Sequence, residues 1–225
     1  MLFRSFGTVV DWHGSICQAV RDLKLEVSPS EFALAWRSLY QPAMAKVRQG
    51  QIAWTSIDVL HRQNLDQILD RFKIRHLSEA QKVDLNLVWH RLKPWPDAVE
   101  GLQRLRKGMM ICTLSNGNLA LLANMAKHAG LPWDLILSAE VFRHYKPDPE
   151  TYLGVAEIFD LQPSEVMLVA AHEDDLDAAK ACGLQTAFVE RPDEYGIGVT
   201  VPKGDLQRFT YSARDFNDLA DQIVR

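Results

Sequence analysis

The sequence LFRSFGTVVDW, at Leu2–Trp12, combines a short apolar run, a Gly-Thr pair and a second apolar run that ends in Asp-Trp. We predict that Leu2–Phe6 forms a buried strand. The tight turn at Gly7 and Thr8 would expose a hydroxyl and backbone N–H groups that suit an anion; a plain strand-to-loop turn is the alternative. The strand is shorter than the usual length of about five or six residues. Either it is truncated, or the true start codon lies upstream of Met1.

From Lys93 onward, short apolar runs alternate with amphipathic helical patterns, which favours a parallel sheet covered by helices on both faces. Leu2–Phe6 would be the central strand of this sheet. We therefore predict an α/β fold with a Rossmann-like parallel-sheet core. The other predicted strands are Met109–Leu114, Leu135–Leu137, Val166–Ala171 and Thr186–Val189, and the predicted helices are Ala98–Arg106, Leu119–His128, Pro149–Phe159 and Leu176–Cys182.

The segment between the first strand and Lys93 is almost wholly helical. Ser28 begins a helix in which Pro42 is expected to produce a kink. A second helix follows over Ile57–Leu69, and a third begins at Ser78. Because this segment follows the first strand, it is predicted to be an insertion into the sheet-forming part. The predicted division is a core domain of residues 1–12 and 94–225 and a helical domain of residues 13–93.

Composition and charge exclude several kinds of partner. Apolar residues make up 47% and charged residues 24% of the 225 residues, as in an ordinary globular domain. The net charge of −4 gives no electrostatic reason to expect nucleic acid or an anionic membrane. No apolar run approaches the roughly 20 residues that span a bilayer. Three widely spaced cysteines and the absence of a secretory leader predict reduced thiols and a cytoplasmic protein.

Polar residues follow the predicted strands, and the carboxyl ends of parallel strands share one edge of a sheet. Ser115 and Asn116 would form an anion cradle there or, alternatively, a helix N-cap. Lys146 lies in a Lys-Pro-Asp-Pro turn, and Tyr152 lies in the helix that follows. Asp175 ends an acidic cluster after the strand at 166–171, and its acidic neighbours at 173 and 174 are expected to be solvated.

These motifs, in this order, resemble those of the haloacid dehalogenase superfamily, and over essentially the whole chain those of its (S)-2-haloacid dehalogenase branch. The resemblance implies a Rossmann-like core with an inserted helical cap. It also implies a hydrolase without metal or other cofactor that acts on short 2-halocarboxylates. In such an enzyme an Asp attacks the α-carbon, expels halide and forms an ester, which water hydrolyses. Relatives are often dimers, so a homodimer is one expectation from the resemblance.

The resemblance implies roles for the side chains around that ester. Lys146 and Tyr152 would set the electrostatics around it, and Asp175 would orient the water. Arg37, in an element that reads Trp-Arg followed by Tyr-Gln, resembles the cap residue that receives the departing halide.

A second group of residues is implied to bind the substrate. Thr8, Ser115 and Asn116 would hold its carboxylate. His172 occupies a substrate-binding position where members of this branch commonly have Asn. In the same motif, Ala170 stands where they commonly have Ser. Some relatives share the Ala-Ala-His sequence, which marks this as variation within the branch.

The residues favour a dehalogenase over a magnesium-dependent phosphatase of the same superfamily. Phosphatases generally carry a general-acid Asp two positions after the nucleophile, where this chain has Phe6. They also hold Mg²⁺ with an Asp where this chain has Ala171. A magnesium site needs carboxylates in addition to phosphate oxygens and water. Of the usual acidic set only Asp175 remains.

Arg4 occupies the position of the nucleophilic Asp. A guanidinium is always protonated and has no lone pair, so Arg4 cannot attack carbon. If it lies next to Lys146 and near Arg37, three cations share one pocket, and Arg4 either pairs with Asp175 or points away. Asp11 is a nearby carboxylate, but relatives with an intact nucleophile also carry an Asp there.

Two interpretations follow. In the first, the protein is an (S)-2-haloacid dehalogenase-type hydrolase whose activity is in doubt because of Arg4. In the second, it is a non-catalytic protein of the same fold that binds a small carboxylate, another small anion or a partner through the same pocket.

Overall fold

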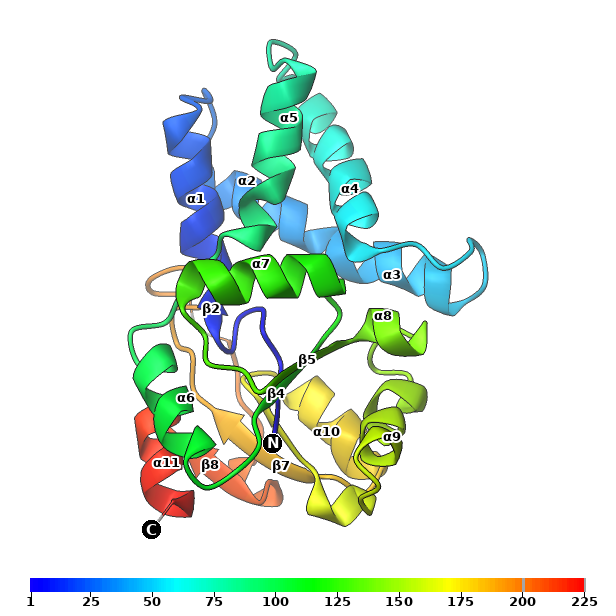
Figure 1. Cartoon of the computed structure of the whole chain (residues 1–225). Coiled ribbons are helices and arrows are strands. Elements are labelled where there is room, and N and C mark those ends of the chain that lie inside the picture. The colour runs from blue at the N-terminus through cyan, green and yellow to red at the C-terminus, as the bar shows by residue number, and fades with distance from the viewer. Residues whose placement is uncertain (200, 225) are drawn as a thin grey trace.

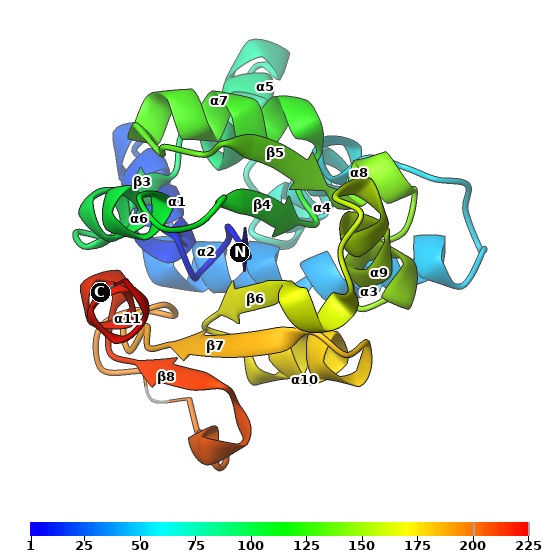
Figure 2. The same ribbon diagram turned by 60° about the horizontal axis from the view of Figure 1, so that its bottom comes forward.

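A computed structural model describes residues 1–199 and 201–224. Its main sheet has the strand order β5-β4-β1-β6-β7-β8, and every neighbouring pair in it is parallel. Figure 2 shows the strands side by side, with the N-terminus between β4 and β6. The predicted Rossmann-like α/β fold is confirmed, and the first strand is central. The strands are β1 (Leu2–Phe3), β4 (Cys112–Ser115), β5 (Leu135–Ser138), β6 (Met167–Ala170), β7 (Gln185–Val189) and β8 (Tyr211–Ala213).

Helices cover both faces of this sheet. They are α6 (Ala98–Arg106), α7 (Leu119–Ala129), α8 (Ala139–Phe142), α9 (Pro149–Ile158), α10 (Glu173–Ala181) and α11 (Phe216–Ile223), with 3₁₀ turns at Pro163–Glu165 and Leu206–Arg208. Successive residues of a strand face opposite sides of a sheet. Phe3 packs toward α11, with its ring 5.6 Å from that of Phe216. Leu2 belongs to the core of the other face, together with Tyr152 of α9 and Leu176 of α10.

The helical segment that connects the first strand to α6 in the sequence lies above the sheet in Figure 1. A small antiparallel ribbon, in which Val10 pairs with Pro94, lies where the chain enters and leaves this segment. The elements are β2 (Val10–Asp11), α1 (Trp12–Asp22), α2 (Pro29–Ser38), α3 (Tyr40–Arg48), α4 (Ile57–Arg71), α5 (Glu79–Asn86), a 3₁₀ turn (Leu87–His90) and β3 (Lys93–Pro94). The division into two domains stays a prediction; residues 200 and 225 of the predicted core lie outside the described residues.

Several local predictions are corrected. The helix that begins after Ser28 does not kink at Pro42. It ends at Ser38, and a new helix begins at Tyr40. Pro42 therefore lies in the first turn of α3, where the missing N–H breaks no intrahelical bond. Strand β1 is also shorter than predicted, because the chain curls after Arg4, with the Val9 N–H donating to the Ser5 carbonyl at 3.0 Å.

The sequence patterns did not predict β8 or α11. The strand has only three residues. The helix buries Phe216, Leu219 and Ala220, whose helical spacing could have identified it. No helix in the described part of the chain is long and apolar enough to cross a membrane. Cys17, Cys112 and Cys182 are free thiols.

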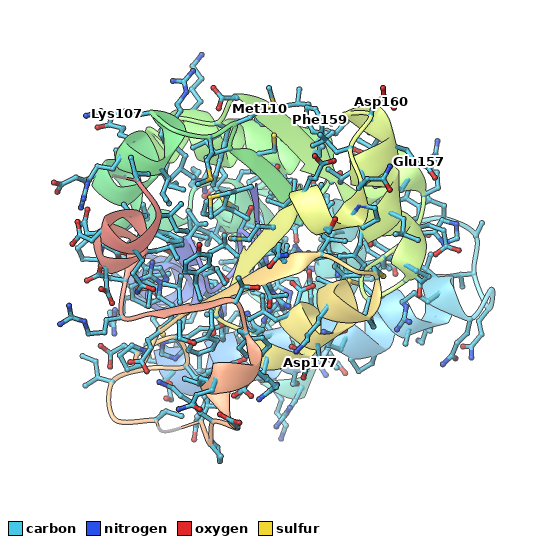
Figure 3. The ribbon with its side chains drawn as sticks, turned by 90° about the horizontal axis from the view of Figure 1, so that it is seen from below. Lys107, Met110, Glu157, Phe159, Asp160 and Asp177 are labelled. Carbon is cyan, nitrogen blue, oxygen red and sulfur yellow. The ribbon has the colours of Figure 1, made fainter. Side chains whose placement is uncertain are left out.

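The two ends of the strands carry different surfaces. At the amino ends, Met110 and Phe159 line a mostly apolar cavity of about 280 Å³. Figure 3 shows both residues on the underside of the molecule, away from α1–α5. The larger cavity, of about 660 Å³, includes Arg4, which directly follows β1, and His172, which follows β6. The carboxyl ends of the strands are therefore the place for a site, as the fold leads one to expect.

Candidate active site

Arg4 is held by the sheet and reaches the large cavity. Its backbone N–H donates to the Val169 carbonyl of β6 at 3.1 Å, so its position is fixed by strand pairing. Its side chain lines the cavity, and 12% of its surface is exposed. The cavity lies between this edge of the sheet and the helical segment, which contributes Arg37 and Tyr40 to the lining.

Asp175 is the centre of a buried charged cluster below this cavity. Its Oδ2 accepts from the Lys146 ammonium at 2.6 Å and from the Arg4 guanidinium at 3.2 Å. Its Oδ1 accepts from the Tyr152 hydroxyl at 2.6 Å. The structure thus brings together four of the predicted residues, which come from the segment after β1, the turn before α9, α9 itself and α10. Of the two orientations that the sequence left open for Arg4, the structure has the pairing with Asp175.

The cluster fixes its own charge state. Burial alone would raise the pKa of the Asp175 carboxyl, but the cations of Lys146 and Arg4 hold this pKa well below its usual range. Burial lowers the pKa of Lys146, and the neighbouring Arg4 lowers it further, while Asp175 opposes both effects. Burial would also lower the pKa of Arg4, but Asp175 and other neighbours raise it above the ordinary value. Position 4 therefore carries a permanent cation.

No carboxylate of the cluster is available as a nucleophile or as a ligand for Mg²⁺. Both oxygens of Asp175 already accept hydrogen bonds, and two of the donors are cations that would repel a metal ion. Asp11 has a structural task, because its Oδ1 accepts from the Gly14 N–H at 2.8 Å and so caps α1. Asp11 also does not belong to the described lining of the cavity.

Arg37 of α2 provides a second cation on the opposite wall. Its guanidinium carbon lies 4.2 Å from the centre of the Tyr40 ring, which is a cation–π contact. Its buried NH1 atom has no hydrogen-bond partner among the described residues. A buried N–H donor without a partner is costly, so this atom is suited to a halide or another small anion in the cavity.

The three residues predicted to hold a carboxylate form internal hydrogen bonds. Thr8 Oγ1 accepts from the Ala171 N–H at 2.9 Å. Ser115 Oγ accepts from the Ser5 N–H at 3.3 Å, and Asn116 Oδ1 accepts from the Lys146 N–H at 2.8 Å. None of the three belongs to the cavity lining in the described chain. They hold the loops of the site in place, and their role toward a substrate stays a prediction.

His172 lines the cavity, as does a residue that the sequence did not single out, Glu194. The His172 Nε2 and the Glu194 Oε1 are 2.8 Å apart, and the Trp12 Nε1 donates to the same oxygen at 3.0 Å. Glu194 lies in an irregular loop after β7, outside every motif. The sequence motifs gave no signal for its place in the site.

A separate group of side chains has the geometry of a metal site. The ligand atoms of His144, Asp148 and Glu150 all lie within 4.8 Å of one another. Asp148 is already paired with Arg48 at 2.7 Å, and none of the three lines the large cavity in the described chain. This group has no part in the site described above.

Comparison with known proteins matches residues 6–183 to the family of haloacid dehalogenase-like hydrolases. The crystal structure of the L-2-haloacid dehalogenase PA0810 superposes with a TM-score of 0.93 at 46% identity, covering 98% of this chain and 97% of that one. The defluorinating L-2-haloacid dehalogenase Rha0230 gives a TM-score of 0.93 at 45% identity, covering 98% and 93%. (S)-2-haloacid dehalogenase 4A of Burkholderia cepacia is 28% identical over 207 residues, covering 86% of this chain and 85% of that protein.

Proposed function

The chain belongs to the haloacid dehalogenase-like hydrolase family, and we propose that its cavity is a site of the (S)-2-haloacid dehalogenase type for short 2-halocarboxylates. The observation that carries the proposal is the buried set of Lys146, Asp175 and Tyr152 around position 4. It lies below a cavity that Arg37 lines with a buried NH1 atom, for which the described residues supply no hydrogen-bond partner. The dehalogenase names of the similar proteins support the same substrate class.

In this proposal each wall of the cavity has one task. Arg37 receives the halide, because its buried NH1 lacks a partner among the described residues. Lys146 and Asp175 supply a fixed pair of charges beside the reacting carbon, and Tyr152 keeps the Asp175 carboxylate in place. A carboxylate at position 4 would attack the α-carbon next to Lys146. The ester route is closed to the chain as it stands, because Arg4 offers no electron pair.

Arg4 also favours a second candidate function, which is the binding of a small carboxylate without reaction. Only one hydrogen bond of its guanidinium is found within the described residues, to Asp175. The group carries five N–H donors in a planar fork that suits a carboxylate. Arg37 adds a cation from the helical segment to the same cavity lining, which also includes Arg191 and Lys203.

Mass spectrometry of Arg4→Asp after incubation with (S)-2-chloropropionate tests the first function. We expect Arg4→Asp to gain the mass of a propionate ester and to release halide on the order of 10³-fold faster than Arg4→Asn. Arg4→Asn is the matched control, because it has the size of Asp without the carboxylate. The chain with Arg4 should show no ester. Failure of Arg4→Asp to form ester or release halide would reject the dehalogenase site and leave the binding function.

A further inference from the structure

The pair formed by His172 and Glu194 is a polar feature of the cavity lining that the ester mechanism does not use. Side-chain exposure is 11% for His172 and 4% for Glu194, so both are nearly buried. Glu194 is fixed by two donors that share its Oε1, the His172 ring and the Trp12 indole. Such a fixed carboxylate beside a histidine is the usual means of orienting a catalytic base.

The hydrogen bonding determines which ring nitrogen of His172 carries the proton. Burial would raise the pKa of Glu194, but His172, Arg37 and Trp12 together hold it below the ordinary value, so the carboxylate is ionised. An ionised carboxylate only accepts hydrogen bonds, and His172 Nε2 must therefore donate. Burial and the cation of Arg4 lower the pKa of His172, which leaves the ring neutral at pH 7. Nδ1 then holds the lone pair.

His172 Nδ1 lacks the partner that such a buried atom requires. It is buried and has no hydrogen-bond partner in the described part of the chain, although the ring lines the cavity. A buried acceptor of this kind is normally satisfied by a water molecule or a ligand. The first loop is shaped around the pair, since a Cβ on Gly7 would lie 2.1 Å from Glu194 Oε1 and 2.8 Å from His172 Cε1.

We propose that His172, oriented by Glu194, is a general base that activates water for direct attack on the α-carbon of a 2-halocarboxylate in the chain that carries Arg4. The water oxygen forms a bond to the α-carbon while the carbon–halide bond breaks. The water proton passes to His172 Nδ1, and the halide leaves toward Arg37. Arg4 takes the substrate carboxylate, so the residue that closes the ester route supports this one. The inference rests on the proposed substrate class.

Single-turnover reaction in H₂¹⁸O with excess protein distinguishes the two routes. Direct attack places solvent ¹⁸O on the α-carbon of the 2-hydroxycarboxylate in the first turnover. An ester route places the label in the enzyme carboxylate and leaves the first product unlabelled. We expect labelled product and no alkylated protein from the chain with Arg4, and unlabelled first-turnover product from Arg4→Asp.

Variants of the pair test the roles of its members. His172→Asn should lower halide release by about 10²-fold or more, which is the typical contribution of a general base. Glu194→Gln is the test of the positioning residue, because it keeps the shape and removes the charge. Since Glu194 raises the pKa of His172 while Arg4 and Arg37 lower it, the rising limb of the pH–rate profile should move to lower pH in Glu194→Gln. Asp193→Asn, an exposed neighbour, is the matched control and should change neither rate nor profile.

Activity in Arg4→Asp with silence in the chain that carries Arg4 would overturn this inference and leave the proposed function standing. Halide release that is unchanged in His172→Asn, or first-turnover product without ¹⁸O, would overturn it as well. Silence of both proteins would reject the substrate class and this inference together. A pH–rate profile that does not move in Glu194→Gln would show that Glu194 only holds its loop.

Discussion

At the scale of single residues, the buried cluster of the site contains one carboxylate and two cations, and this balance of charge affects the stability of the protein. Asp175 neutralises part of the charge of both Lys146 and Arg4, at 2.6 and 3.2 Å. Replacing a buried ion pair as a whole can be nearly neutral, but removal of one partner leaves an uncompensated charge. Arg4 thus affects folding stability as well as reactivity, because its buried cation requires the counter-charge of Asp175.

Asp175→Asn should therefore lower the free energy of unfolding by about 3–5 kcal/mol, because two adjacent cations would remain buried without a counter-charge. Urea denaturation at pH 7 measures this. Asp177→Asn is the control on the same helix, since Asp177 is half exposed and pairs with the partly exposed Arg208. An equal loss of stability in both variants would contradict the account.

The same carboxylate predicts how stability depends on pH. Its pKa is depressed in the folded protein, and its unfolded value is about 3.9. Its contribution is thus fully present above about pH 4 and is lost as the pH falls below that value. Stability measured from pH 7 down to pH 3 should fall more steeply in the native protein than in Asp175→Asn. Parallel curves for the two proteins would show that another group causes the loss of stability at low pH.

At the scale of elements, the strand ends were predictable and the loops were not. Arg4 and Asp175 lie in motifs that follow strands β1 and β6, and Lys146 follows the short helix α8 after β5. Parallel strands bring such motifs to one edge whatever the details of the loops. Glu194 reaches the same cavity from a loop without periodicity, so no local pattern reports its position. The break between α2 and α3 was predictable in kind but not in position. Pro42 has no N–H to donate to the carbonyl of Ser38, and α2 ends at that residue rather than kinking at the proline.

Contact between α6 and α11 gives an element-scale prediction. A Cβ on Gly101 of α6 would lie 2.4 Å from Phe216 Cβ and 2.8 Å from the Phe216 backbone carbon, so the helices would have to separate. We expect Gly101→Ala to lower the free energy of unfolding by about 1–3 kcal/mol, as overpacking does. Gly108→Ala is the control, because its Cβ would find only Val224 methyl carbons at 3.7 and 3.8 Å. Thermal unfolding of both variants measures the difference. Equal melting temperatures would contradict the expected overpacking between α6 and α11.

At the scale of the whole molecule, one arginine joins segments that are far apart in the sequence. Arg191, after β7, donates to both oxygens of Asp97 at 2.9 Å and to the Thr8 carbonyl at 2.7 Å. Its guanidinium also lies 4.7 Å from the centre of the Phe216 ring. The first loop, the start of α6 and the C-terminal helix are thereby held at one point in the wall of the cavity, because Arg191 also lines it.

Arg191→Lys should lower the melting temperature although the charge is kept, because an ammonium cannot form the planar two-bond contact with Asp97. A loss of about 2 kcal/mol corresponds to roughly 4–8 °C in a protein of this size. Differential scanning calorimetry measures the change. Lys203, which pairs with Glu190 on the surface, supplies the control through Lys203→Arg, for which no change is expected. An unchanged melting temperature in Arg191→Lys would show that the two-bond contact between Arg191 and Asp97 does not stabilise the protein.

The ribbon of β2 and β3 has a consequence for how such a protein can diversify. Because Val10 and Pro94 are paired neighbours, the long helical excursion departs from and returns to adjacent points. An inserted segment of a different length therefore needs only to begin and end at this two-stranded ribbon. The strands that precede Arg4 and Asp175 need not be rearranged. The helical segment that carries Arg37 can thus be replaced by another insertion during evolution, while the residues at the edge of the sheet stay the same.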